Sequence, residues 1–133
     1  MKFIVHGEPM GKERPRYWNG HMYTPKKTAE YERLVKREFE EQVNCGAFPT
    51  GTPLSVTVDA FYKIPKGATK KQKERMMANL DRPTKKPDFD NIGKIICDSL
   101  NGLAYSDDCQ IVDASVHKYY SADPRVEVTI EVV

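Results

Sequence analysis

The segment at residues 25–44 constrains the fold most, because its pattern is that of one long amphipathic helix. Thr24 supplies an N-cap and Pro25 the first helical position, and apolar residues recur at helical spacing: Tyr31, Leu34, Val35, Phe39 and Val43. A helix with one apolar stripe must bury that stripe against another element. The rest of the chain is therefore expected to provide a matching apolar surface.

Segments with strand periodicity provide that surface. Residues 3–6 form a short β-rich run, and residues 54–62 alternate between apolar and other residues. Residues 112–116 and 126–132 alternate in the same way around a turn, which predicts an antiparallel hairpin between them. This order of elements predicts an α+β fold, a single domain with a mixed β-sheet of about four strands and helices packed on it.

Two further segments complete the predicted layout. Residues 66–80 are rich in Lys and Met but only weakly periodic, and they fit either a short helix or a flexible basic excursion. Asp90 can cap another helix that ends at Asn101-Gly102. The apolar residues on one side of that helix are Ile92, Ile95, Ile96 and Leu100.

Composition excludes several classes of protein. A chain of 133 residues, 39% of them hydrophobic, is long enough for one core and too short for two ordinary domains. No apolar run approaches the roughly 18 residues of a membrane span, and the N-terminus lacks the apolar region of a signal peptide. Cys45, Cys97 and Cys109 have no Cys-x-x-Cys spacing, which argues against a disulfide framework and a zinc site. We expect a cytoplasmic protein with no membrane partner and no organic cofactor.

Five aspartates and one lysine are concentrated in residues 88–108, although the net charge of the chain is only +2. Concentrated like charge destabilises a fold unless a cation neutralises it, and carboxylates are the hard ligands that Mg²⁺ and Mn²⁺ prefer. The cluster therefore predicts a metal site for phosphate chemistry. Its members are Asp88, Asp90, Lys94, Asp98, Asp107 and Asp108.

The segments around this cluster are basic. Residues 11–37 carry eight basic and three acidic residues, and residues 63–86 carry nine basic and two acidic ones. Residues 88–123 reverse the balance, with seven aspartates against two lysines. Any single basic run could be merely a solvated face, but two of them around an acidic segment indicate an enzyme that binds a polyanion and cuts it with metal ions.

The spacing of the acidic residues suggests individual roles. Asp88 and Asp90, two apart in extended backbone, would point to the same side and could share a metal ion. Lys94 lies one helical turn beyond Asp90, and Asp108 can fold back to complete the site. In two-metal hydrolysis, one ion activates a water and the other stabilises the leaving oxygen, while a lysine offsets transition-state charge. Asp88, Asp90, Asp108 and Lys94 fit those roles.

Simpler explanations exist for each residue taken alone. Asp90 could be only an N-cap, and Lys94 with Asp98 could be only an ion pair one turn apart. Asp107 and Asp108 could form only a turn. The coincidence of all of them favours a catalytic site, in which Asp98 is a helix-face partner of Lys94.

Basic and aromatic residues elsewhere are candidates for DNA contacts. Lys12, Arg14 and Arg16 could contact phosphates, and the interleaved Tyr17, Trp18 and Tyr23 could stack on unpaired bases. Alternatively, Trp18 anchors this loop on the core. A second set could either track a DNA arm or only add solubility: Lys70, Lys71, Lys73 and Arg75.

Several spaced motifs resemble a known family. Residues 86–94 read Lys-Pro-Asp-Phe-Asp-Asn-Ile-Gly-Lys, residues 97–102 read Cys-Asp-Ser-Leu-Asn-Gly, and residues 106–112 read Ser-Asp-Asp-Cys-Gln-Ile-Val. Together with residues 7–16 and 23–31, they resemble the RusA-type Holliday junction resolvases, a family common in phages and prophages. The resemblance spans nearly the whole chain.

This resemblance implies one RusA-like endonuclease domain over residues 1–133, acting as a homodimer. Such enzymes are Mg²⁺-dependent endodeoxyribonucleases that resolve four-way DNA junctions by paired symmetrical nicks in recombination and repair, with Mn²⁺ as a possible substitute. By motif position, the catalytic and metal-binding acids map onto Asp88, Asp90 and Asp108, with Asp107 as a supporting metal-site acid, and the catalytic lysine maps onto Lys94. The alternatives are a less selective branched-DNA or flap nuclease and a non-catalytic DNA-binding module.

Overall fold

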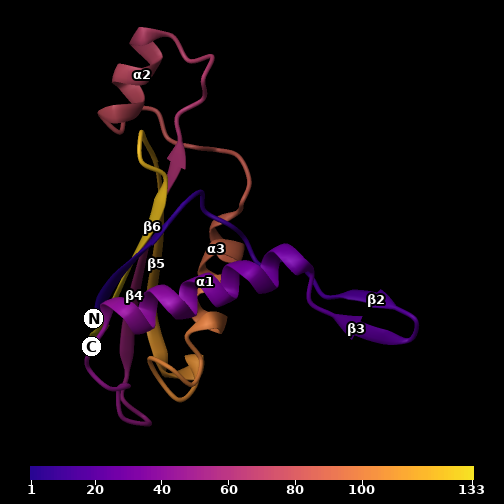
Figure 1. Ribbon diagram of the computed structural model, residues 1–133. Helices are drawn as coiled ribbons and strands as arrows, with labels where there is room; N and C mark the ends of the chain where they lie inside the picture. Colours follow the sequence, from indigo (N-terminus) through magenta and orange to yellow (C-terminus); the bar gives the residue numbers. More distant parts are fainter.

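The computed structural model describes residues 1–133 and places the helices α1 and α3 against a four-stranded sheet (Figure 1). None of these helices combines the length and apolar character that crossing a membrane requires. The layout confirms the predicted α+β class with a mixed sheet. In chain order, the elements are β1 (Lys2–His6), β2 (Arg16–Trp18), β3 (His21–Tyr23), α1 (Lys26–Gln42), β4 (Leu54–Lys63), α2 (Lys70–Met77), α3 (Phe89–Ser99), the 3₁₀ turn η1 (Asp108–Gln110), β5 (Ile111–Ser121) and β6 (Arg125–Val132).

The sheet has the strand order β1-β6-β4-β5. Strand β6 is antiparallel to both β1 and β4, whereas β5 is parallel to β4. Parallel neighbours need a long crossover, and the connection that contains α2 and α3 provides it. The predicted hairpin between the last two strands is wrong, because β4 lies between β5 and β6. Alternation along a strand shows which side chains are buried, but it does not identify the neighbouring strand.

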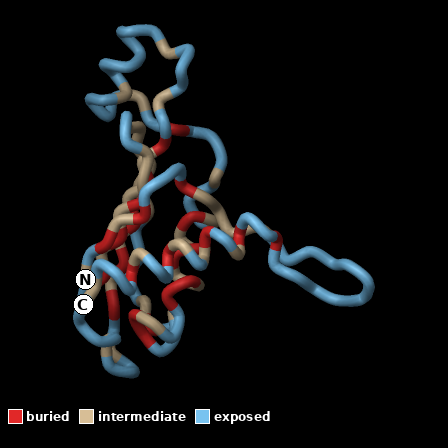
Figure 2. The backbone as a smooth tube through the Cα atoms, viewed as in Figure 1, coloured by how far each residue is buried: buried red, intermediate tan, exposed pale blue.

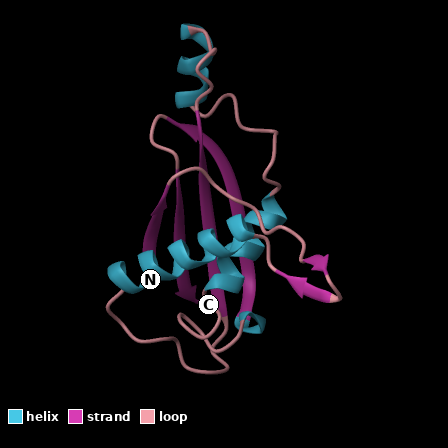
Figure 3. Cartoon of the chain, turned by 45° about the vertical axis from the view of Figure 1, so that its right-hand side comes forward, coloured by secondary structure: helices cyan, strands magenta, loops and turns pink.

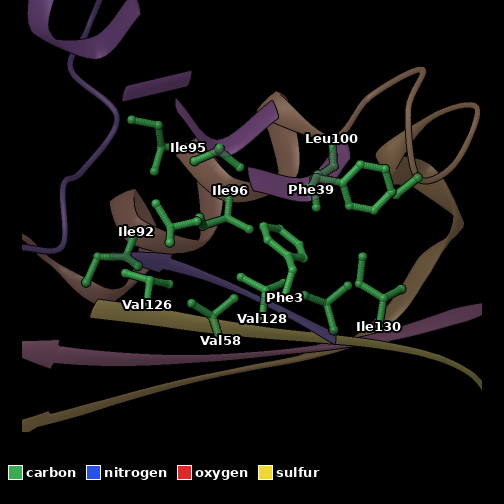
Figure 4. Packing of buried hydrophobic residues seen from close by; sticks show 14 of the residues in the cluster. Phe3, Phe39, Val58, Ile92, Ile95, Ile96, Leu100, Val126, Val128 and Ile130 are labelled. Carbon is green, nitrogen blue, oxygen red and sulfur yellow. The ribbon is translucent and has the colours of Figure 1, made fainter. Parts of the chain in front are cut away.

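The hydrophobic core fills the space between the sheet and the helices α1 and α3 (Figures 3 and 4). Every second residue of β4 from Leu54 to Tyr62 is buried, as the alternation predicted. Phe3 of β1 meets Phe39 of α1 edge to face, with ring centroids 5.5 Å apart. Ile92 of α3 lies on the sheet side of its helix and is fully buried. The apolar stripe of the long helix is thus covered as expected.

Both core helices begin differently from the prediction. Helix α1 starts at Lys26, and Pro25 itself occupies the N-cap position without a side-chain cap. Helix α3 has Asp88 at its N-cap position, so Asp90 lies inside the first turn rather than capping it. The simple explanation of Asp90 as a cap is therefore wrong, and its carboxylate has no capping role.

Helix α2 shows that the basic excursion is ordered. Thr69 and Gln72 form a reciprocal capping box at its start. None of its residues is buried, and it projects beyond the end of β4 as a separate lobe (Figures 1 and 2). We call residues 64–87, which leave β4 and return to α3, the α2 lobe.

A second projection, the ribbon of β2 and β3, was not predicted. Asn19 and Gly20 connect its strands, and both have positive φ angles, 54° and 79°. Positive φ at both central residues defines the turn that best matches the twist of a two-residue hairpin. The Asn-Gly pair between Trp18 and His21 was the sequence signal for this hairpin.

Candidate active site

An open cleft of about 640 Å³ lies between α3 and β5, and we call it the acidic cleft. Aspartates from two parts of the chain line it, Asp90 and Asp98 from α3 and Asp108 from η1. Lys94 of α3 and His117 of β5 also line it. The fold thus brings three of the four predicted catalytic residues, Asp90, Lys94 and Asp108, to one cleft.

A second cleft, of about 880 Å³, lies beside the first, and we call it the basic cleft. Residues 9–16 form one wall and residues 86–91 contribute to the other. Asp88 lines the basic cleft but not the acidic one, whereas Asp90 lines both clefts. The two clefts therefore meet at the first turn of α3. The basic residues of the basic cleft are Lys12, Arg14, Arg16 and Lys86.

Asp88 and Asp90 do not project together from extended backbone as predicted. Asp88 has an extended conformation, with φ −71° and ψ 152°, while Asp90 is helical. Because α3 begins between them, their side chains point in different directions. Asp88 lines the basic cleft alone, and Asp90 lines both the basic and the acidic cleft. Any ion shared by both must sit at the boundary between the clefts.

The turn that carries these acids is held by Tyr62 of β4. Its hydroxyl donates a hydrogen bond of 2.6 Å to the carbonyl oxygen of Pro87. Burial raises the pKa of Tyr62 to about 12, and the nearby Asp88 and Tyr120 contribute to the increase. Tyr62 consequently remains a protonated donor at neutral pH and fixes the residue before Asp88.

The same turn contacts the segment that leads to β2. The amide of Lys12 donates to the carbonyl oxygen of Asn91 over 2.9 Å. A Cβ atom at Gly11 would lie 3.0 Å from the Cβ atoms of both Asn91 and Pro87. Only glycine fits this approach without displacement, so Gly11 fixes the spacing between the two walls of the basic cleft.

Lys12 is engaged within the protein. Its ammonium lies 3.1 Å from Glu32 and 3.6 Å from Asp98, and its side chain is only 18% exposed. Asp98 also lies 3.9 Å from the ammonium of Lys94, one helical turn away. The assignment of Asp98 as a helix-face partner of Lys94 agrees with these distances. Lys12 supports the wall of the basic cleft and has little ammonium surface left for a phosphate.

Asp108 is positioned by the end of α3 and by Gln110. The side chain of Asn101 accepts a hydrogen bond of 2.9 Å from the amide of Asp108. The buried Gln110 accepts from the amide of Ser106 over 3.1 Å. Its own amide group donates to the carbonyl oxygens of Pro49 and Thr52, each at 3.1 Å. These bonds hold the loop so that Asp108 faces α3.

The carboxyl group of Asp108 is electrostatically disfavoured as an anion. Burial raises its pKa above the usual value, and the neighbouring Asp107 and Asp98 raise the pKa further. Asp107 itself is exposed at the N-cap of η1 and does not line the acidic cleft. The crowding of carboxylates at Asp108 is the local charge imbalance that a cation would relieve.

No three His, Cys, Asp or Glu side chains converge closely enough to hold a metal ion by themselves. The predicted metal ligands Asp88, Asp90, Asp107 and Asp108 thus do not form a ready cage. Mg²⁺ usually retains several waters and takes one or two carboxylates together with substrate phosphates. The hard oxygen donors Asp90 and Asp108 in the acidic cleft fit an ion that is bound in this way.

The predicted DNA-contacting residues fall into two places. Arg14 and Arg16 are exposed and line the basic cleft next to Asp88. The second set lies on α2, in the lobe beyond β4, away from both clefts: Lys70, Lys71 and Lys73. Trp18 is 75% exposed, so the interpretation of this residue as an anchor on the core is wrong.

Sequence reasoning assigned no role to His117, which the structure places in the acidic cleft. Its Nδ1 atom lies 2.9 Å from the carboxylate of Asp59, its register partner on β4. These residues are far apart in the chain and become neighbours only because β4 and β5 are parallel. No sequence motif signals this pair, because the predicted pairing of β5 was with β6.

Comparison with known proteins identifies the family of this chain. A model of the family "Endodeoxyribonuclease RusA" matches residues 6–131, a range that includes both clefts. The chain is also 42% identical over 139 aligned positions to an uncharacterized protein of Bacillus subtilis (strain 168), YqaN. That alignment covers 100% of this chain and 96% of YqaN. This protein therefore belongs to the RusA family of endodeoxyribonucleases.

Proposed function

We propose that this protein is a Mg²⁺-dependent endonuclease that resolves four-way DNA junctions by paired nicks, in cytoplasmic recombination and repair. The observation that carries the proposal is the convergence of Asp90, Lys94 and Asp108 on the acidic cleft beside a basic cleft. A DNA strand attracted to the basic cleft would present a phosphate where Asp90 joins the two clefts. Membership of the RusA family supports this activity.

The residues of the acidic cleft can divide the chemistry among them. If Mg²⁺, or Mn²⁺ in its place, were bound there, it would lower the pKa of a water and offset charge on the leaving oxygen. Asp90 and Asp108, which both line the acidic cleft, would hold the ion, and Asp88 would add an oxygen from the basic cleft. Asp107 supports the site through its charge. The ammonium of Lys94 lies where it can offset negative charge on the phosphate as the attack proceeds.

Paired nicks require two active sites in a fixed relation, and each chain presents one acidic cleft. A four-way junction has pairs of equivalent strands, so two symmetry-related copies of this chain match its symmetry. A homodimer is therefore part of the proposal. Sedimentation at several protein concentrations, with and without junction DNA, tests this component separately.

Cleavage of a labelled junction tests the catalytic assignment. Wild-type protein with Mg²⁺ should produce nicks at symmetry-related positions on opposing strands, and EDTA should abolish them. Asp90→Asn should reduce the cleavage rate by at least about a hundredfold, because it removes a ligand from the ion. Asp123→Asn, in the exposed turn before β6, is the matched control and should cleave normally. Full activity of Asp90→Asn would contradict the proposal.

A comparison of DNA substrates distinguishes junction resolution from the two alternative functions, less selective cleavage of branched DNA and DNA binding without cleavage. Junction, flap and duplex DNA of equal length should be assayed at one salt concentration, because affinity for DNA depends steeply on salt. Preference for the junction supports resolution, whereas equal cleavage of the flap indicates a less selective branched-DNA nuclease. Binding that EDTA leaves unchanged, without nicking under any metal, would indicate a non-catalytic DNA-binding module.

A further inference from the structure

The ribbon formed by β2 and β3, residues 16–23, stands away from the body of the protein, and we call it the aromatic arm (Figures 1 and 2). All of its residues are exposed. Tyr17 and Trp18 are 72% and 75% exposed, and Met22 is 61% exposed. Because these large side chains bury little apolar surface, they contribute little to the stability of the fold. Their placement calls for a partner outside the chain.

The two faces of the aromatic arm differ in chemistry. Residues opposite each other in an antiparallel pair point to the same side. Arg16 pairs with Tyr23 and Trp18 pairs with His21, so one face alternates aromatic and basic or imidazole groups. The other face carries Tyr17 opposite Met22. Aromatic rings beside cationic groups are the combination that binds unpaired nucleic-acid bases along a phosphate backbone.

The root of the aromatic arm is fixed relative to the acidic residues. Gly11 packs so closely that a Cβ there would lie 3.0 Å from the Cβ atoms of Pro87 and Asn91, and the Lys12 amide donates a hydrogen bond to the carbonyl oxygen of Asn91. Arg14 and Arg16 then line the basic cleft, which also contains Asp88. A strand that lies in the basic cleft therefore has the acidic residues at one end and the aromatic arm at the other.

Charge favours DNA over a second copy of this chain as the occupant. Residues 13–27 contain four basic residues and one acidic residue, Glu13, whose carboxylate lies 3.6 Å from Arg16, so the segment keeps a net positive charge. In a symmetric contact between two arms, this basic segment of one copy would lie against the same segment of the other, and the like charges would repel. A polyanion with exposed bases satisfies both the charge and the rings.

We propose that Trp18, with Tyr23 on the same face, stacks on bases that are unpaired at the branch point of DNA and so selects branched over duplex substrates. This inference rests on the proposed function, since it assumes that the bound polyanion is branched DNA. The basic cleft supplies the affinity common to all DNA forms, and the aromatic arm supplies the preference. Duplex DNA offers no open base for the ring of Trp18.

Trp18 is the only tryptophan of the chain, so its fluorescence reports on the aromatic arm alone. The titration uses Asp90→Asn protein in EDTA, which leaves the DNA intact, with a four-way junction, a single-stranded oligonucleotide and a duplex. Junction and single strand should quench the emission and shield it from iodide, and the duplex should do neither. Quenching that depends on protein concentration without DNA would place the arm on a second copy and overturn the inference.

Substitutions test the energetic consequence. Trp18→Ala should weaken binding to the junction by about tenfold and leave binding to the duplex unchanged, because one base-stacking contact is lost. Trp18→Phe should restore most of the preference, and Val132→Ala, an exposed apolar residue at the end of β6 that lines neither cleft, is the control.

Equal junction-to-duplex ratios for Trp18→Ala and wild type would overturn the inference, even where the wild type resolves junctions. If the wild type cuts no junction, the proposed function fails separately. Quenching by the single strand then still supports stacking by the arm, and its absence refutes stacking.

Discussion

Gly11→Ala should separate the two walls of the basic cleft. Gly11 has no positive φ, so alanine is compatible with its backbone and the effect is purely steric. The added Cβ would lie 3.0 Å from the Cβ atoms of both Pro87 and Asn91. Because those atoms flank the turn that carries Asp88 and Asp90, relief of the clash must move that turn or the root of the aromatic arm.

The magnitude follows from the contact distances. Carbon atoms are best separated by about 3.5–4.0 Å, so each contact of 3.0 Å must open by at least about 0.5 Å. Overpacking of this kind costs about 1–3 kcal/mol, and loss of the bond from Lys12 to Asn91 adds about 1 kcal/mol. The stiffer unfolded chain offsets about 0.4–1 kcal/mol. A net loss of about 2 kcal/mol lowers Tm by roughly 7 °C in a chain of this length.

Thermal unfolding and junction cleavage measure the two consequences. Cleavage should fall by about tenfold or more at saturating DNA, because small displacements of catalytic groups are costly. Gly46→Ala is the matched control, since a Cβ there meets nothing within 4 Å and its φ is not positive. Gly46→Ala should keep full activity, and its free energy of unfolding should rise by about 0.4 kcal/mol. If Gly11→Ala is as stable and active as Gly46→Ala, the spacing argument is wrong.

Two further predictions concern charge. Asp108→Asn should abolish cleavage yet stabilise the fold at neutral pH. Because the pKa of Asp108 is raised in the folded state, the folded protein keeps this proton to a higher pH than the unfolded chain does. The stability of the wild type therefore falls as the pH rises from the ordinary aspartate pKa through the raised one. Urea unfolding should be measured between about pH 3 and 7, the range over which aspartates titrate. The free energy of unfolding should fall with rising pH in the wild type and fall less in the variant. Replacing Lys70, Lys71 and Lys73 with Gln should reduce the slope of log affinity for DNA against log salt by about 3, at one phosphate per lysine. An unchanged slope in filter binding would show that α2 does not touch DNA.

The elements that depend on local periodicity were predictable from the sequence. Strand β4 buries every residue that its alternation indicates, and helix α1 buries Tyr31, Val35 and Phe39 of its predicted stripe. Leu34 and Val43 are only half-buried, because they lie at the edge of the core. The convergence of Asp90, Lys94 and Asp108 was also predictable, since two of them share a helix face and the third follows the end of that helix after a short loop.

What escaped prediction depends on contacts between distant segments. The parallel pairing of β5 with β4, and with it the pair of Asp59 and His117, results from the crossover through α3 and has no local signature. The separation of Asp88 from Asp90 depends on the residue at which α3 begins. A shift of that start by one residue changes which cleft a carboxylate lines. The aromatic arm did have a local signal, the Asn19-Gly20 pair, which was recognised only as part of a loop.

The strand order has a consequence for synthesis. Strand β6 is the antiparallel neighbour of both β1 and β4. Lys2 of β1 therefore cannot pair with its register partner, Thr129, until β6 has been synthesised. Contacts this distant in the chain form slowly, and a ribosome-bound chain displays its helices before the sheet that covers them exists. The acidic cleft has β5 as one wall, so it too is completed late. A nascent chain therefore lacks a complete acidic cleft until almost all of the described fold has been translated.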